Sequence, residues 1–180
     1  AIVSAAMEIL TGQANVVLCG GTEAMSMAPH VIHGLREGQR FGRAPAMKDL
    51  LWECLTDTVT GLAMAQTAEK LGDQYGLKRE EVDEVAVASQ VRWQAANAAG
   101  RFNDEIVPKR KKADVDVKGD EQPRATDMAT LAKLPPFFKK DGLITAGNAS
   151  GICDGSASLI VADAKWAEKR GLQPIARLVG

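Results

Sequence analysis

The side chains best suited to covalent chemistry in this sequence are three cysteines and two histidines: Cys19, Cys54, Cys153, His30 and His33. A nucleophilic cysteine needs a neighbouring base or a helix N-terminus that stabilises its thiolate. Cys19 instead ends an apolar run, Cys54 lies beside Trp52, and Cys153 precedes an acidic residue. We therefore expect Cys19 and Cys54 to be packing residues and the carboxylate beside Cys153 to disfavour its thiolate, with a nucleophilic role for any of the three as the less favoured alternative.

The same residues do not form a metal motif. The spacing of the cysteines matches no zinc pattern, and neither histidine has a nearby cysteine or a pair of carboxylates. An odd number of widely spaced cysteines also fits free thiols in a reducing compartment better than a disulfide framework. The sequence thus predicts no metal site and a protein that is not secreted.

A segment of small residues, Ala146–Gly151, is the best candidate for ligand binding. Glycine and alanine let a ligand or another backbone approach closely, and Asn148 and Ser150 add polar side chains two residues apart. A tight turn between a strand and a helix explains the same pattern, so both interpretations stay open. The turn at Gly20-Gly21-Thr22-Glu23 is not a dinucleotide or phosphate-binding fingerprint.

Composition is that of an ordinary globular protein. The chain has 180 residues, of which 46% are hydrophobic and 25% charged, and its formal net charge is −1. This charge argues against a nucleic-acid partner, and no apolar run approaches the roughly 20 residues that span a membrane. The basic run Lys109–Lys112 is expected to be a solvated loop or edge strand, or alternatively a cradle for a polyanion such as a nucleotide phosphate.

The first 45 residues predict part of an α/β layer followed by a long excursion. Ala1–Leu10 is apolar on all faces, which indicates a buried helix, and Gly12 suits its end. Asn15–Cys19 is rich in β-branched residues and predicts a buried, parallel strand. Residues Met25–Pro45 have no clear period and are expected to form an interfacial or functional loop.

The middle of the chain is mainly helical in its pattern. Helices are predicted over Leu62–Tyr75 and Arg79–Ala99, each followed by a glycine, and a short helix over Met128–Leu134. Short strands are predicted at Asp104–Val107 and Ala113–Val117. In the second helix the apolar face would consist of Val82, Val85, Ala86, Ser89, Trp93 and Ala96.

The C-terminal residues return to α/β patterning. They predict a strand at Ser156–Ala162, a helix capped by Asp163 that ends at Gly171, and another strand at Ile175–Val179. We therefore predict an α/β fold: an incomplete βαβ layered core with a mainly helical insertion. The expected boundaries are 1–24 for the N-terminal core, 25–151 for the insertion and 152–180 for the return to the core.

Several ordered motifs resemble the thiolase family along essentially the whole chain. In family order they are Val17–His30, Ala63–Glu69, Ala88–Gln90, Gly100–Phe102, Asp104–Pro108, Lys133–Phe138 and Thr145–Gly151. The resemblance implies an internal piece of an acyltransferase that moves acyl groups between coenzyme A and a 3-ketoacyl-CoA or acetyl-CoA through a cysteine acyl-enzyme. Residues 25–151 would be the loop domain that binds coenzyme A as a substrate, and no permanently bound cofactor is implied.

The resemblance also implies which residues contact coenzyme A. Met64 would lie near the pantetheine, Ser150 and Gly151 at the return to the core, and Arg124 and Phe138 elsewhere along the ligand. Two alternatives stay open, since Met64 also fits the apolar stripe of its helix and Arg124 also fits a solvated loop. The family's catalytic cysteines and histidine lie outside these motifs, so we expect no catalytic residue among the 180.

Three hypotheses about function follow. The first is a thiolase whose catalytic residues lie outside this sequence, forming a homodimer or homotetramer in the bacterial cytoplasm or the mitochondrial or peroxisomal matrix. The second is a non-catalytic acyl-CoA-binding module. The third is an interaction role, with an oligomer contact at Arg36, Arg40, Phe41 and Arg43.

Overall fold

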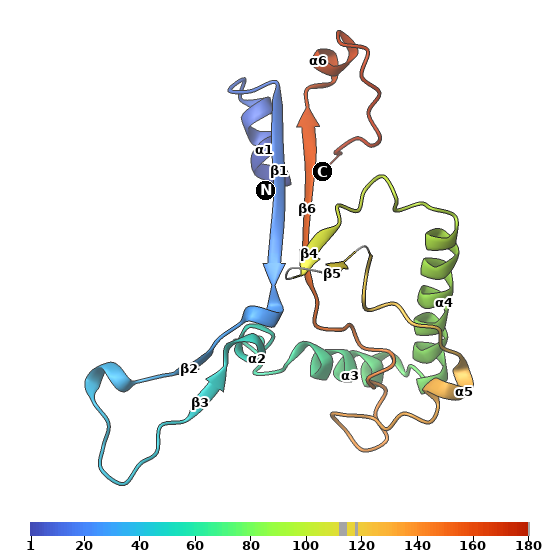
Figure 1. Cartoon of the computed structure of the whole chain (residues 1–180). Helices are drawn as coiled ribbons and strands as arrows, with labels where there is room; N and C mark the ends of the chain where they lie inside the picture. The colour runs from blue at the N-terminus through green and yellow to red at the C-terminus, as the bar shows by residue number, and fades with distance from the viewer. Residues whose placement is uncertain (112–114, 118, 180) are drawn as a thin grey trace. The chain divides into compact units, whose positions relative to one another are not determined.

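The computed structural model describes residues 1–111, 115–117 and 119–179, and it divides the chain into two compact units (Figure 1). Residues 1–27 and 152–180 form the first, here called the sheet unit. Residues 28–151 form the second, here called the helical unit. Each unit is described by itself.

The sheet unit is built on a two-stranded antiparallel ladder. Strand β1 (Val16–Ala24) pairs with β6 (Asp154–Ala162) along its full length, from Val16 opposite Ala162 to Ala24 opposite Asp154. Helix α1 (Ile2–Leu10) packs on the ladder, and helix α6 (Ala164–Glu168) follows β6. Asp163 caps α6, because its carboxylate accepts a hydrogen bond from the Trp166 amide at 2.9 Å.

Three predictions for the sheet unit are corrected. The strand that begins near Asn15 is antiparallel rather than parallel, because its partner β6 follows the long insertion and runs back beside it. Neither this strand nor α1 is buried: Leu18 is 74% exposed and Leu10 is 80% exposed. Residues 175–179 form no strand among the described residues. Ala5 of α1 is buried, but large apolar side chains on both segments stay exposed in the described residues.

The helical unit begins with a hairpin where the sequence predicts an irregular loop. Strand β2 (His30–Ile32) pairs antiparallel with β3 (Met47–Asp49). The short 3-10 helix η1 (Met25–Met27), at the end of residues 1–27, precedes β2, and a second one, η2 (Leu35–Glu37), follows it. Helix α2 (Leu50–Cys54) starts directly after β3. Its N-cap is Asp49, whose carboxylate accepts a hydrogen bond from the Leu51 amide at 2.9 Å.

Two longer helices follow and agree with their predicted bounds. Helix α3 (Met64–Tyr75) ends at Gly76, which adopts a left-handed φ of 65°, and α4 (Arg79–Ala98) ends just before Gly100 at φ 68°. Both helices are capped from within the first turn. The Gln66 side chain accepts from the Ala63 amide at 2.9 Å, and the Glu81 carboxylate accepts from the Lys78 amide at 2.7 Å.

The remaining elements of the helical unit are short. Strand β4 (Lys109–Lys111) pairs antiparallel with β5 (Val115–Val117), and helix α5 (Met128–Leu131) is shorter than the predicted span. The predicted strand at Asp104–Val107 is wrong. Hydrogen bonds from Glu105 and Ile106 back to the Phe102 carbonyl curl this segment into a turn. The proposed polyanion cradle at Lys109–Lys112 rests on side chains outside the described residues.

Candidate functional site

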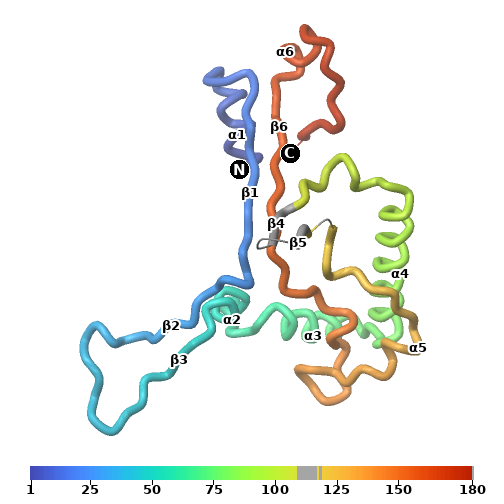
Figure 2. Tube along the Cα trace, viewed as in Figure 1, coloured from blue at the N-terminus to red at the C-terminus, as the bar shows by residue number. Residues whose placement is uncertain are grey.

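The candidate ligand-binding segment lies in what we call the return loop, Leu143–Gly151, which brings the chain out of the helical unit (Figure 2, orange). Its first residues are held by Glu69 of α3. The two carboxylate oxygens accept hydrogen bonds from the Leu143 amide at 2.9 Å and the Ile144 amide at 2.8 Å. Glu69 is only 5% exposed, so this buried charge is stabilised by two oriented backbone donors.

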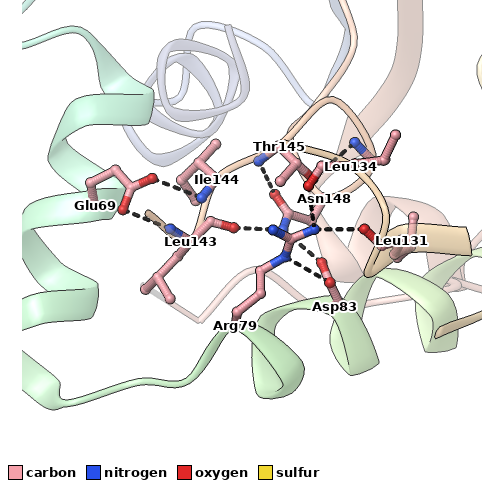
Figure 3. A network of polar contacts seen from close by, with 10 residues as sticks. Glu69, Arg79, Asp83, Leu131, Leu134, Leu143, Ile144, Thr145 and Asn148 are labelled. Atoms are coloured by element: carbon pink, nitrogen blue, oxygen red, sulfur yellow. Dashed lines mark hydrogen bonds and ion pairs between the residues drawn. The ribbon is translucent and has the colours of Figure 1, made fainter. Parts of the chain in front are cut away.

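A second buried carboxylate holds the centre of the same loop from α4 (Figure 3). Asp83 is 2% exposed; one of its oxygens accepts from Arg79 Nε at 2.7 Å and the other from Asn148 Nδ2 at 2.8 Å. The Asn148 amide also donates to the Leu143 carbonyl, and its oxygen accepts from the Thr145 amide, both at 2.8 Å. Asn148 thus links the helix to the loop backbone.

Arg79 completes this network on its outer side. Its Nη2 donates to the carbonyls of Leu131 at 2.6 Å and Leu134 at 3.2 Å, which lie at and just beyond the end of α5. No buried side-chain polar atom among the described residues lacks a hydrogen-bond partner. The loop, α3, α4 and α5 are therefore tied together by fully satisfied polar contacts.

The outer surface of the return loop forms one wall of a groove, which we call the α4 groove, of about 820 Å³. One face of α4 forms another wall, and residues Gln122 and Arg124 contribute the rest. The lining residues are Leu77, Glu81, Val82, Val85, Ala86, Ser89, Gln90, Gln122, Arg124 and Ala146–Gly151. Apolar helix side chains thus face a rim of amides, hydroxyls and one guanidinium, which suits an elongated ligand with both apolar and polar parts.

Three of the five residues predicted to contact a ligand line this groove together. Arg124, Ser150 and Gly151 are all exposed in it. The Arg124 guanidinium donates to the Ala146 carbonyl at 2.7 Å, while its backbone amide donates to Gln90 Oε1 at 2.9 Å. Arg124 is therefore held against α4 by its backbone amide and against the return loop by one N–H of its guanidinium. The guanidinium has further N–H groups that a ligand in the groove could use.

The other two predicted residues, Met64 and Phe138, do not line the α4 groove. Met64 is the first residue of α3 and is 49% exposed, with its amide bonded to the Leu55 carbonyl beyond α2 at 3.1 Å. Phe138 stacks on Trp52 of α2, with ring centroids 6.3 Å apart, and meets Phe137 edge-on at 4.8 Å. Both residues therefore lie near α2, on a different face of the helical unit.

Sequence reasoning missed the residues that position the loop. Glu69, Arg79 and Asp83 fall at ordinary positions of predicted helices, where a charged side chain is usually solvated. The two acids are nevertheless among the most buried polar residues of the described chain. The one available signal is the spacing of Arg79 and Asp83 at i and i+4, which predicts an ion pair but not its burial.

Other chemistry is sparse in the part of the chain that the structure describes. No group of three or more His, Cys, Asp or Glu side chains there could hold a metal ion, and no helix there is long and apolar enough to cross a membrane. The three cysteines are free thiols; Cys54 is exposed rather than packed as predicted, and Cys153 is exposed as well.

Comparison with known proteins shows the family. The model of the thiolase N-terminal domain matches residues 1–165.

The chain belongs to the thiolase N-terminal domain family.

Individual thiolases are similar over almost the whole chain. It is 47% identical to the human mitochondrial 3-ketoacyl-CoA thiolase, over 99% of this chain and 46% of that protein. It is 46% identical to an acetyl-CoA acetyltransferase of Rhizobium meliloti (strain 1021), over 96% of this chain and 44% of that protein. The chain therefore spans a little under half the length of these relatives.

The same likeness holds in three dimensions. The crystal structure of human mitochondrial 3-ketoacyl-CoA thiolase in complex with CoA matches with a TM-score of 0.88 and 46% sequence identity, over 96% of this chain and 44% of that one. The acetyl-CoA acetyltransferase of Bacillus anthracis also matches with a TM-score of 0.88, at 43% identity. These matches confirm the predicted family and the α/β thiolase-like fold.

Proposed function

We propose that this chain is the coenzyme A-binding part of a thiolase that transfers acyl groups between coenzyme A and a 3-ketoacyl-CoA or acetyl-CoA. The observation that carries the proposal is the α4 groove, whose polar rim brings together Arg124, Ser150 and Gly151. The complex with CoA reported for the human relative supports the choice of ligand. In this assignment residues 25–151 act as the loop domain, and residues 1–24 and 152–180 are parts of the core.

The geometry suits different parts of the coenzyme A molecule. The guanidinium of Arg124 offers charge and a donor fork for a phosphate. Ser150 offers a hydroxyl, and Gly151 beside it adds no side chain to the groove wall, as a slender amide-containing chain requires. We assign Met64 and Phe138 as additional contacts, and their position near α2 requires that the ligand extend beyond the α4 groove.

For the complete protein we propose the chemistry that the thiolase resemblance implies. A cysteine acyl-enzyme forms and is then resolved by a second thiol, with residues outside this sequence as nucleophile and acid–base groups. The 180 residues alone are therefore expected to be inactive. The proposed setting is fatty-acid β-oxidation by a homodimer or homotetramer in the mitochondrial matrix or the bacterial cytoplasm, with the peroxisomal matrix as an alternative.

A binding experiment tests the assignment directly. Isothermal titration calorimetry of coenzyme A with the 180-residue chain is expected to show saturable binding. Ser150→Trp should abolish this binding, because the indole would fill the groove. Thr58→Trp is the matched control, since Thr58 is exposed and does not line the groove. Binding that survives Ser150→Trp and fails with Thr58→Trp would reject the groove as the site.

Two further measurements separate the enzyme from a non-catalytic acyl-CoA-binding module. Acetoacetyl-CoA thiolysis by the 180-residue chain is expected to be undetectable, and robust turnover would contradict the assignment of the catalytic groups to other residues. The intact mass of the protein from its natural source decides the rest. A mass near 19.1 kDa would favour the module, and a mass about twice that would favour a thiolase.

A further inference from the structure

We infer that Asp83 is a positioning residue for the coenzyme A groove, acting through Asn148 on the return loop without touching the ligand itself. The inference rests on the proposed function of the groove. Asp83 is 2% exposed and is not among the groove's lining residues, whereas Asn148, which it holds at 2.8 Å, is one of them.

The first step of the argument is that Asp83 fixes the orientation of the Asn148 amide. A primary amide can be turned over with little change of shape, so its environment must distinguish the nitrogen from the oxygen. Asp83 and the Leu143 carbonyl are both acceptors, and both face the nitrogen at 2.8 Å. The Thr145 amide is a donor and faces the oxygen at 2.8 Å. Only one orientation of Asn148 satisfies all three partners.

The second step is that this orientation fixes the part of the loop that lines the groove. Thr145 is 1% exposed, and its hydroxyl accepts a hydrogen bond from the Gly147 amide at 3.2 Å. Ala146 between them presents its carbonyl to Arg124. Because Asn148 holds the Thr145 amide, the placement of Ala146 and Gly147 and the anchoring of Arg124 depend on it.

The third step is that Asp83 must be a carboxylate to do this. Its two oxygens accept from Arg79 and from Asn148 at the same time. An asparagine at this position has a single acceptor oxygen, and the positively charged Arg79 would take it. Its own amide nitrogen would then face the Asn148 nitrogen, donor against donor, and would drive Asn148 out of its orientation.

The test is Asp83→Asn in the 180-residue chain, measured by amide hydrogen exchange and by coenzyme A binding. Exchange of the Thr145 amide is expected to accelerate, while the Leu143 and Ile144 amides, which Glu69 holds, keep their protection. The dissociation constant for coenzyme A is expected to rise about tenfold, because binding would then have to re-order a loop that has lost one hydrogen bond to a charged group. Asp73→Asn is the matched control, since Asp73 is an exposed acid paired only with Lys139 among the described side chains.

The two readouts keep the possible failures apart. Equal acceleration of all three amides would mean a general loss of stability and would overturn the positioning role. Faster exchange of the Thr145 amide with an unchanged dissociation constant for coenzyme A would overturn the proposed effect of Asp83 on ligand binding. If the unsubstituted chain does not bind coenzyme A at all, the proposed function fails, while the exchange pattern still decides whether Asp83 orients the loop.

Discussion

The two units of this chain are ordered by different kinds of contact. In the helical unit, the buried side chains of Glu69 and Thr145 accept hydrogen bonds from backbone amides, and that of Asp83 accepts from the side chains of Arg79 and Asn148. In the sheet unit, order comes from a nine-residue ladder between β1 and β6, and large apolar side chains such as Leu18 stay exposed. The comparison shows that a short chain can specify a loop through oriented hydrogen bonds where apolar burial is scarce.

Close backbone approaches sharpen the same contrast. In the helical unit, a Cβ on Gly147 would lie 2.5 Å from a Leu131 methyl group, and one on Gly72 would lie 2.2 Å from a Leu143 methyl group. In the sheet unit the close approach is to backbone instead: a Cβ on Gly20 would lie 2.4 Å from the Ala157 carbonyl oxygen of the paired strand, while Gly21 has nothing within 4 Å of such a position. Tight packing around the return loop therefore accompanies its polar network.

The most disruptive change should be loss of the buried charge partner. Arg79→Met leaves the 2% exposed Asp83 without its ion pair and removes a donor from the carbonyls of Leu131 and Leu134, at and just beyond the end of α5. Breaking a buried pair in this way should lower the free energy of unfolding by about 3 kcal/mol. Urea denaturation followed by tryptophan fluorescence measures it, since Trp52 and Trp93 both lie in the helical unit. Lys139→Met, which breaks an exposed pair, should leave the midpoint unchanged.

A smaller loss of unfolding free energy is expected when a substitution leaves no buried charge unpaired but deprives a backbone amide of its acceptor. Glu69→Gln keeps the shape of the side chain but turns one acceptor oxygen into a donor that faces the Leu143 or Ile144 amide. The expected cost is about 2 kcal/mol of unfolding free energy. Amide exchange should localise it to those two residues. Unchanged protection of both amides would show that Glu69 does not order the loop.

Gly147→Ala and Gly21→Ala form a matched pair between the two units. The first should cost about 1.5 kcal/mol, because its new methyl group collides with Leu131 and Leu134. The second should change stability by less than about 0.5 kcal/mol, since the position is open. Thermal unfolding of both variants by circular dichroism checks the difference, and equal midpoints would contradict the tight packing of the return loop.

Much of this architecture follows from local sequence signals, and α4 shows both their success and one cause of their failure. The ends of α3 and α4 were predictable because Gly76 and Gly100 stop them at positive φ. The buried side of α4 was not, because hydrophobic periodicity selects Val85, which is 71% exposed and lines the groove, over Asp83. Periodicity assumes that apolar residues are the buried ones, and a paired carboxylate at the loop contact reverses that assumption.

The candidate site shows the same limit. The family resemblance implies contacts at Arg124, Ser150 and Gly151, which the fold brings into one groove, and at Met64 and Phe138, which lie near α2. Of the residues that hold the groove in shape, Arg79 and Asp83 lie outside the family motifs. Their roles depend on contacts between segments far apart in the sequence, such as Asp83 with Asn148, and no local pattern encodes these.

In the sheet unit, a surface change should affect association more than stability. Leu18 is 74% exposed on β1, so Leu18→Ser should alter the unfolding free energy by no more than about 0.5 kcal/mol. Removing a large apolar side chain from an open face should also reduce self-association. Light scattering against concentration tests this. A variant that unfolds readily would show that Leu18 contributes to packing after all.

The smallest effect concerns pH. Asp127 caps α5, and hydrogen bonds from the side chain and backbone amide of Thr130 lower the pKa of its carboxyl below the usual 3.8. A lowered folded-state pKa means that the cap stabilises the fold above the unfolded value and that this contribution is lost as the pH falls through the folded value. In the unsubstituted protein, the protection of the α5 amides from exchange should therefore fall slightly below about pH 4. In Asp127→Asn this fall should be absent. An identical pH profile in both proteins would rule out this linkage.

The pairing of Ala24 with Asp154 has a consequence for protein engineering. Facing residues of an antiparallel ladder lie about 5 Å apart, so the polypeptide leaves for the helical unit and comes back from it at almost one point. Segments with adjacent ends are the ones that tolerate excision, transplantation and circular permutation. Residues 28–151 should accordingly be exchangeable between related proteins as one continuous segment. That segment contains both the groove and the carboxylates that shape it.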